Sequence, residues 1–169
     1  ALALAELATR AGIPAGVMNI VTGMDAPAIG QALCADSRIR KMTFTGSTEV
    51  GRILMRQSAD TVKKMSLELG GNAPLLVFDD ADLDVAVEGA MLSKFRNAGQ
   101  TCVCANRIFV QDGIYDAFAK RLAEKAASMT VGSGTSDGVE QGPLIDQQGF
   151  EKVCSHVEDA IANGANVLA

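Results

Sequence analysis

Short apolar runs of strand length alternate with helical stretches along the whole chain of 169 residues. A strand, a helix and another strand in turn are typical of a parallel sheet, because the helix carries the chain back to the start of the next strand. The apolar spacing predicts strands over residues 17–21, 41–45, 65–69, 75–78 and 107–110. It predicts helices over residues 1–11, 27–33, 47–59, 79–95, 115–129 and 150–162. The order of these segments indicates an α/β fold.

Charge and composition exclude several classes of function. Hydrophobic residues make up 48% and charged residues 21% of the chain, as in folded globular proteins. A net charge of −5 argues against a nucleic-acid partner, which calls for a basic face. No apolar run approaches the roughly 20 residues of a membrane helix, and no basic leader precedes the first segment. We expect neither nucleic acid nor membrane as a partner.

The four cysteines form no CxxC pair, and the common zinc-binding patterns need more ligands than the single histidine, His156, supplies. We therefore expect no metal site. Scattered thiols are typical of a reducing compartment, so a cytoplasmic location is expected. The remaining question is which individual thiol carries chemistry.

Residues 44–51 (FTGSTEVG) end a predicted strand at a glycine and begin a predicted helix at Ser47. The free N–H groups and the dipole at a helix start can hold a phosphate, and Gly46 and Gly51 would let a ligand approach the backbone. The alternative is that Ser47 only caps its own helix. The segment matches neither the GxGxxG fingerprint nor a Walker loop.

Residues 67–71 (LELGG) place the carboxylate of Glu68 in an otherwise apolar strand. Loss of water around a carboxylate raises its pKa, which suits a general base that works near neutral pH. The alternative is a glutamate at a strand end that points to solvent.

Residues 97–104 (NAGQTCVC) place Cys102 in a glycine-containing bend just after a predicted helix end. Such a thiol is exposed enough to react, and the nearby cations Lys94 and Arg96 would favour its thiolate. Most single cysteines are inert packing residues, which is the alternative for Cys102.

These three segments, in their order and spacing, resemble the signature segments of the aldehyde dehydrogenase superfamily, and the similarity runs along the whole chain. The resemblance implies that Cys102 is the nucleophile that forms a thiohemiacetal and that Glu68 activates the water that hydrolyses the thioester. It also implies a cofactor site in which Ser47, Gly46 and Gly51 meet the diphosphate. Gly23 would lie on the adenine side, and Leu69 and Gly70 near the nicotinamide.

The resemblance also implies that part of the site lies outside these residues. The family's Pro-Trp-Asn segment, the lysine that holds the adenosine ribose and the Glu-x-Phe-Gly-Pro segment are not in this sequence. We therefore expect an internal fragment, inactive alone. Residues 1–70 would be the end of a Rossmann-type cofactor-binding domain, and residues 71–169 the start of an α/β catalytic domain. Residues 165–169 themselves look like the opening of a further strand after Gly164.

Residues 93–107 look most like bacterial succinate-semialdehyde dehydrogenases, enzymes of 4-aminobutyrate degradation, a resemblance that favours NADP over NAD. Arg96, six residues before Cys102, is then expected to bind the carboxylate of the substrate through a forked, charge-assisted pair. The alternative is that Arg96 only compensates the dipole at the C-terminus of its own helix. Two alternatives stay open: a dehydrogenase of a related semialdehyde or of a broad range of aldehydes, and an α/β module without activity. A cysteine hydrolase is disfavoured, because His156 is far from the thiol in the sequence. The full-length enzyme is expected to be a homo-oligomer.

Cys104 follows Cys102 with one residue between them. A thiol at this distance can resolve an oxidised Cys102 into a disulfide, provided that the loop bends, because residues two apart in an extended chain lie at the limit of disulfide geometry. The alternative is that Cys104 is a small buried residue without a redox role.

Overall fold

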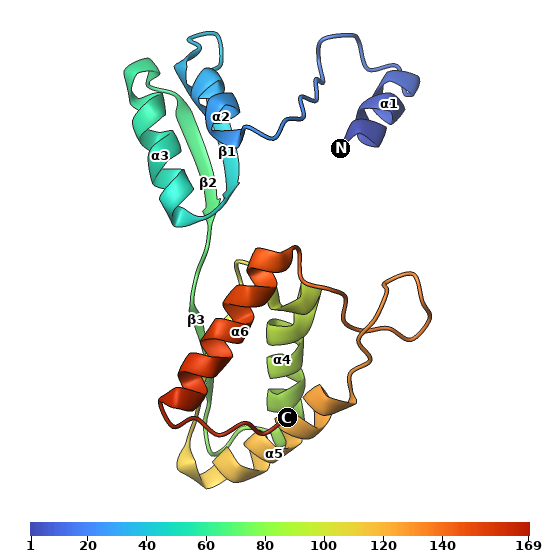
Figure 1. Ribbon diagram of the computed structural model, residues 1–169, viewed down its shortest axis with the longest axis vertical. Helices are drawn as coiled ribbons and strands as arrows, with labels where there is room; N and C mark the ends of the chain where they lie inside the picture. Colours follow the sequence, from blue (N-terminus) through green and yellow to red (C-terminus); the bar gives the residue numbers. More distant parts are fainter. The chain divides into compact units, whose positions relative to one another are not determined.

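The computed structural model describes residues 1–169 and divides them into two compact units, Ala1–Leu67 and Glu68–Ala169 (Figure 1). The first unit holds α1 (Leu2–Arg10), α2 (Ala26–Ala35), β1 (Lys41–Gly46), α3 (Thr48–Ser58), the 3-10 helix η1 (Ala59–Thr61) and most of β2 (Lys64–Leu69). The second holds β3 (Ala73–Val77), α4 (Leu83–Phe95), the 3-10 helix η2 (Arg96–Gly99), β4 (Ala105–Val110), α5 (Asp112–Ser128) and α6 (Gln147–Ala162).

In the first unit α2 and α3 pack together beside the pair of strands β1 and β2. The cap Asp25 starts α2, where its carboxylate accepts the Ala28 N–H at 3.0 Å. Cys34 and Leu54 are the buried apolar side chains between these helices. Close helix contact depends on Gly30, because a Cβ there would lie 3.3 Å from the Leu54 side chain.

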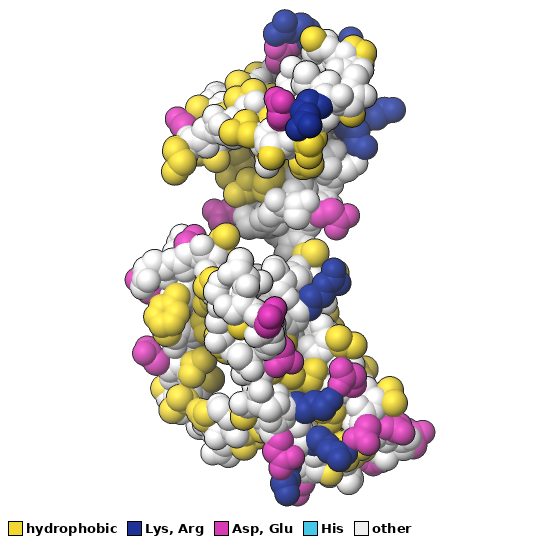
Figure 2. Space-filling model, turned by 90° about the vertical axis from the view of Figure 1, so that its right-hand side faces the viewer, with side chains coloured by type: hydrophobic (Ala, Val, Ile, Leu, Met, Phe, Trp, Pro, Cys, Tyr) yellow, Lys and Arg dark blue, Asp and Glu magenta, His cyan; other side chains and the backbone are white.

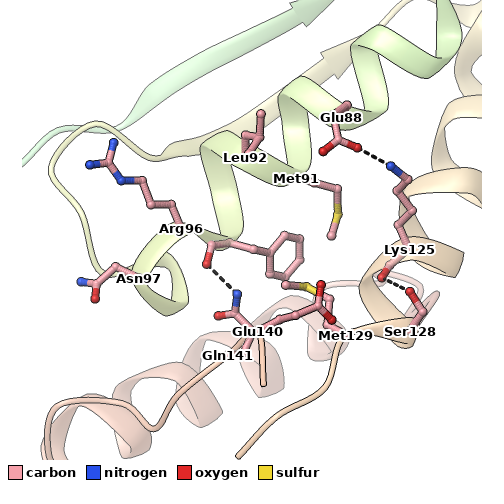
Figure 3. A pocket seen from close by; sticks show the side chains of 11 residues that line it. Glu88, Met91, Leu92, Arg96, Asn97, Lys125, Ser128, Met129, Glu140 and Gln141 are labelled. Atoms are coloured by element: carbon pink, nitrogen blue, oxygen red, sulfur yellow. Dashed lines mark hydrogen bonds and ion pairs between the residues drawn. The ribbon is translucent and has the colours of Figure 1, made fainter. Parts of the chain in front are cut away.

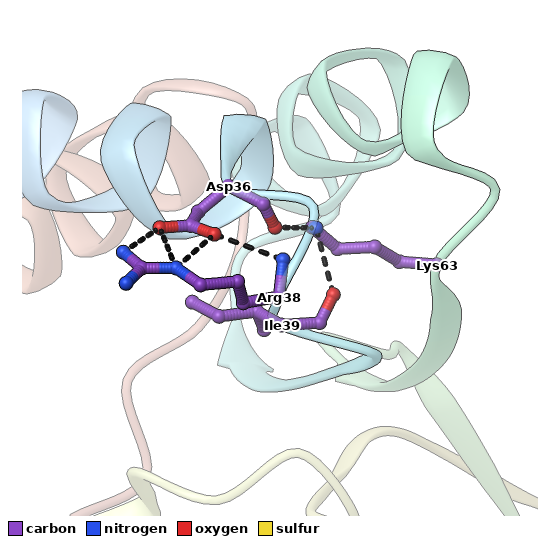
Figure 4. Close-up of polar contacts among 4 residues, drawn as sticks. All are labelled: Asp36, Arg38, Ile39 and Lys63. Atoms are coloured by element: carbon purple, nitrogen blue, oxygen red, sulfur yellow. Dashed lines mark hydrogen bonds and ion pairs between the residues drawn. The ribbon is translucent and has the colours of Figure 1, made fainter.

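A polar cluster closes the end of α2 (Figure 4). Buried Lys63 donates to the carbonyl oxygens of Asp36 at 2.5 Å and Ile39 at 2.8 Å, which satisfies carbonyls that the helix end leaves free. The carboxylate of Asp36 accepts hydrogen bonds from Nε and Nη2 of the Arg38 guanidinium and from the Arg38 backbone N–H. These bonds, the side-chain ones foremost, hold the pKa of the Asp36 carboxyl well below its usual range.

In the second unit β3 and β4 form a parallel pair, in which Leu75 lies opposite Ile108. Helices α4 and α5 pack together with this pair of strands around one hydrophobic core. The side chains of this core that are most fully buried are Val77, Val87, Ala90 and Phe118. Two ion pairs on the surface, Arg121 with Asp84 and Lys125 with Glu88, also connect α5 to α4.

Much apolar surface is exposed on both units, as the yellow side chains in Figure 2 illustrate. One exposed row follows a single face of α6, with a spacing of three or four residues that is typical of an amphipathic helix. About half of each side chain in this row is exposed: Phe150, Val153, Val157 and Ile161. None of the helices is both long enough and apolar enough to cross a membrane.

The α/β prediction is confirmed, and the parallel pairing of β3 with β4 agrees with it. The strand predicted over residues 17–21 is wrong. There the Val17 N–H donates to the Pro14 carbonyl and the Asn19 side chain to the Gly16 carbonyl, so local turns take up the polar groups that a strand would offer to a neighbour. The strand expected to open at residues 165–169 is also absent.

Candidate active site

A left-handed turn connects α4 to the segment that carries Cys102. Three successive residues have positive φ: Asn97 at 53°, Ala98 at 53° and Gly99 at 74°. Glycine adopts this conformation without cost and asparagine tolerates it, whereas an alanine there is strained, so the strain is greatest at Ala98. Gly99 is required for a second reason, since a Cβ there would lie 3.1 Å from the Lys94 carbonyl oxygen. The turn directs the chain out of α4 and into the segment that carries Cys102.

Cys102 lies in a tight turn just before β4, with an exposed and unbonded thiol. The prediction that this thiol is accessible is confirmed. Its backbone N–H donates to no group in the chain, although the neighbouring Cys104 N–H bonds to the Thr101 carbonyl. An accessible thiol beside a free N–H donor can attack a carbonyl carbon and stabilise the oxyanion that forms.

The segment that follows Glu68 lies against this turn. A Cβ at Gly71 would lie 3.1 Å from the Cys102 carbonyl oxygen, so only glycine fits without displacement. The Asn106 amide donates to the Gly71 carbonyl at 3.4 Å, and Arg107 donates to the Asn72 carbonyl at 2.8 Å. Both segments enter neighbouring parallel strands, so the amino ends of β3 and β4 meet here.

Glu68 is the second-last residue of β2 and is exposed. The expectation that an apolar strand removes water from this carboxylate is wrong, because Glu68 is exposed although its neighbours Leu67 and Leu69 are half-buried. The chain shows the alternative, a glutamate near a strand end that faces solvent. Glu68 nevertheless lies three residues before Gly71, which packs against the backbone carbonyl of Cys102.

The two cations before the thiol differ in their contacts. The Lys94 ammonium donates to Asn106 Oδ1 at 2.9 Å, so it supports the start of β4. Arg96 is exposed, and its guanidinium forms no hydrogen bond or ion pair in the chain. In Figure 3 its side chain points away from Met91 and Met129. Arg96 is therefore free to meet a ligand, whereas Lys94 is already bonded.

The second cysteine of the segment is buried. Cys104 has 1% of its surface exposed, and its sulfur lies 2.7 Å from Thr101 Oγ1 and 3.7 Å from the Lys94 carbonyl oxygen. Both thiols are free. This conformation matches the alternative in which Cys104 is a buried packing residue, and its redox role stays a prediction.

In the first unit the start of α3 has the features of an anion site. Ser47 is the cap, and its hydroxyl accepts the Val50 N–H at 3.2 Å. Its role toward a phosphate stays a prediction. The N–H groups of Thr48 and Glu49 donate to no group in the chain and remain available. Gly46 has a local role that the sequence did not indicate, because a Cβ there would meet the Phe44 ring at 2.3 Å.

A cavity of about 610 Å³ opens between the 21–30 segment, β1 and α3. Its walls are largely apolar and include Gly23, Phe44, Val50 and Ile53. Gly51 is buried in α3, while Leu69 is half-buried and Gly70 exposed at the end of β2. The free N–H groups and the apolar cavity fit the diphosphate and the flat aromatic base of a dinucleotide.

Sequence reasoning missed three residues that shape these sites: Gly71, Asn106 and Phe44. The double glycine at residues 70–71 is a visible signal for Gly71, although it does not indicate which segment packs there. No signal identified Asn106, whose amide joins Lys94 to Gly71 across residues far apart in the sequence.

Residues 1–169 match the family described as the aldehyde dehydrogenase family. The chain is 61% identical to glutarate-semialdehyde dehydrogenase of Pseudomonas putida and to the NADP(+) succinate-semialdehyde dehydrogenase of Escherichia coli, which align with 100% and 99% of this chain and 35% of each relative. The solved structure of succinate-semialdehyde dehydrogenase from Burkholderia pseudomallei superposes with a TM-score of 0.95 at 58% identity, over 98% of this chain and 34% of that one.

The match to the family model covers the whole chain, so the chain belongs to the aldehyde dehydrogenase family. It spans about 35% of the length of the curated relatives that it matches.

Proposed function

We propose that this chain supplies the nucleophile and part of the cofactor site of an NAD(P)-dependent aldehyde dehydrogenase. The observation that carries the proposal is the contact of Gly71 with Cys102, which brings the segment after Glu68 to an exposed thiol with a free N–H. In this assignment, residues 1–70 belong to the cofactor-binding domain and residues 71–169 to the catalytic domain.

The chemistry begins at the Cys102 sulfur. The thiolate attacks the aldehyde carbon, and the Cys102 N–H donates to the oxygen of the resulting thiohemiacetal. When bound, the nicotinamide cofactor supplies the acceptor for the hydride that leaves this adduct. The product on Cys102 is a thioester. Glu68 then removes a proton from a water molecule, the hydroxide attacks the thioester carbon, and the thiolate leaves as the acid is released.

The first unit would hold the cofactor. Ser47 and the free N–H groups at the start of α3 would bind the diphosphate, with Gly46 and Gly51 as the small residues around them. The cavity bordered by Gly23 would take the adenine. Leu69 and Gly70 would lie beside the nicotinamide. The name of the Escherichia coli relative supports NADP as the cofactor.

The substrate that fits best is a short aldehyde with an acid group at its far end. Arg96 supports this choice, because its guanidinium is exposed, free of partners and six residues before the nucleophile. The relatives named for succinate semialdehyde and glutarate semialdehyde have equal identity to this chain, so both aldehydes are candidates. Succinate semialdehyde remains our first choice.

The test separates the two steps on Cys102 in the intact protein. Cys102→Ala should lower turnover by more than about a thousandfold while cofactor binding, measured by calorimetry, is retained. Glu68→Gln should still release one equivalent of reduced cofactor in a burst, followed by slow turnover, because thioester hydrolysis is impaired more than hydride transfer.

The matched controls are Cys154→Ala and Glu158→Gln, which change the same residue types in α6. Both should keep normal turnover. Near-normal turnover of Cys102→Ala would exclude it as the nucleophile, and normal steady-state kinetics of Glu68→Gln would exclude that residue as the base.

A further inference from the structure

We infer that Gln100 and Gln141 are positioning residues, which clamp the turn of residues 96–102 to the segment 141–145 and so place the Cys102 nucleophile. The inference rests on the proposed function, since it concerns the same thiol. Neither glutamine side chain contacts the Cys102 sulfur, so both would act through the shape of the turn.

The side-chain amide of Gln100 forms hydrogen bonds through both its oxygen and its nitrogen. Its Oε1 accepts the Ile145 N–H at 2.9 Å, and its Nε2 donates to the Asn97 carbonyl at 3.3 Å. Asn97 reciprocates, with its Nδ2 donating to the Gln100 carbonyl at 3.2 Å. One side chain thus connects the left-handed turn to a segment 45 residues further along the chain.

The amide of Gln141 holds the other end of the turn. Its Nε2 donates at 2.8 Å to the carbonyl of Phe95, which is the last residue of α4 (Figure 3). The backbone of Gln141 is itself fixed, because its N–H donates to the Thr130 carbonyl and its carbonyl accepts the Gly132 N–H. The anchor for the turn is therefore a fixed part of the loop.

The turn needs such support because its backbone conformation is unfavourable. Asn97 and Ala98 are left-handed without being glycine, and such residues persist only when their surroundings over-determine them. Outside η2, the backbone bonds of this segment run from the Gln100 N–H to the Asn97 carbonyl and from the Cys104 N–H to the Thr101 carbonyl. Without the two side-chain amides, Asn97 and Ala98 are free to return to right-handed conformations. That change would move both the thiol and the N–H of Cys102.

The experiment compares Gln100→Met and Gln141→Met in the intact protein with Gln147→Met. Gln147 is the matched control, because its amide bonds only to Glu151 on the same helix. Two rates are measured: single-turnover formation of reduced cofactor at saturating aldehyde and NADP, and alkylation of Cys102 by iodoacetamide. Gln141→Lys, which keeps a donor toward Phe95, serves as the conservative variant.

Both methionine variants should form reduced cofactor roughly ten- to a hundredfold more slowly, because small misplacements of reacting groups have effects of this size. Alkylation should stay near the rate of the unchanged protein, since it requires exposure of the thiol and not its alignment. The Michaelis constant for the cofactor should not change. Gln147→Met should behave as the unchanged protein, and Gln141→Lys should recover most of the lost rate.

Normal single-turnover rates in both methionine variants would overturn the inference that the two glutamines position Cys102. Equal losses in alkylation and in turnover would overturn it too, because the thiol would then be lost from the surface and not misaligned. If Gln100→Met fails to fold, the pair Gln141→Met and Gln141→Lys decides the matter alone. Absence of any reduced cofactor from the unchanged protein would instead reject the proposed function.

Discussion

The two units use their apolar residues in different ways. In the first unit Val50 and Ile53 are each about two-fifths exposed, at 40% and 42%, because they border an open cavity. In the second unit Val87 and Phe118 are 1% and 2% exposed in a closed core. The apolar side chains of the first unit thus border an open cavity, whereas those of the second fill a closed core.

The largest expected effect tests the closed core. Phe118→Ala should lower the free energy of unfolding of the second unit by about 3–5 kcal/mol, because a ring is replaced by a cavity that the neighbours cannot fill. The matched change in the first unit, Leu54→Ala, should cost about 2 kcal/mol, near the low end for buried leucine, because Leu54 already borders open space. Native-state hydrogen exchange of amides in α5 and α3 measures both losses separately. Equal losses would contradict the difference in packing between the units.

Much of the fold followed from the apolar pattern. The periodicity located the six α-helices, whereas two of the six predicted strands are absent. The run 17–21 has the same apolar pattern, but the turn bonds of Val17 and Asn19 prevail there. Pattern alone cannot distinguish a strand from a turn when no neighbouring strand accepts its hydrogen bonds.

The site was less predictable than the fold. A cap is a local property, so Ser47 could be recognised from its neighbours in the sequence. The contact of Gly71 with Cys102 and the bonds of Gln100 and Gln141 join residues far apart, and no local signal reports them. The error at Glu68 has the same origin, because burial depends on what packs on the strand and not on the strand itself.

The next effect concerns the free guanidinium on the second unit. Arg96→Ala should raise the Michaelis constant for succinate semialdehyde by roughly thirtyfold or more, about 2 kcal/mol, through loss of a charged pair with the substrate carboxylate. Butanal, an uncharged aldehyde of the same chain length, is the matched substrate and should be little affected. Equal losses on both aldehydes would mean that Arg96 supports the Cys102 turn and does not bind the substrate carboxylate.

A smaller effect separates the two roles of Ser47 in the first unit. Ser47→Ala should reduce the stability of that unit by about 1 kcal/mol, through loss of the cap, and weaken cofactor binding. Ser47→Asp keeps a capping oxygen but adds a negative charge, so it should preserve stability while it repels the diphosphate. Asp146→Ala removes the cap of α6 in the other unit and should leave cofactor affinity unchanged. Normal affinity in Ser47→Asp would leave Ser47 with the capping role alone.

The smallest effect is a dependence on pH that belongs to the first unit. The bonds from Arg38 hold the pKa of the Asp36 carboxyl below its usual range, so the folded unit binds this proton less readily than the unfolded chain does. The resulting stability is present above about pH 4, the ordinary value for aspartate, and is lost as the pH falls below it.

Asp36→Asn should therefore flatten the acid side of the stability curve of the first unit and leave that of the second unit unchanged. The change should be slight, since the Arg38 side chain is 89% exposed and the pair is screened by salt. Hydrogen exchange of the α2 amides between about pH 3 and 6, at low and high salt, measures it. Asp60→Asn, a change at an aspartate without an ion-pair partner, is the control. If Asp36→Asn and Asp60→Asn give the same acid response, the cluster around Asp36 contributes no pH dependence. The carbonyl contacts of Lys63 would then be what closes the end of α2.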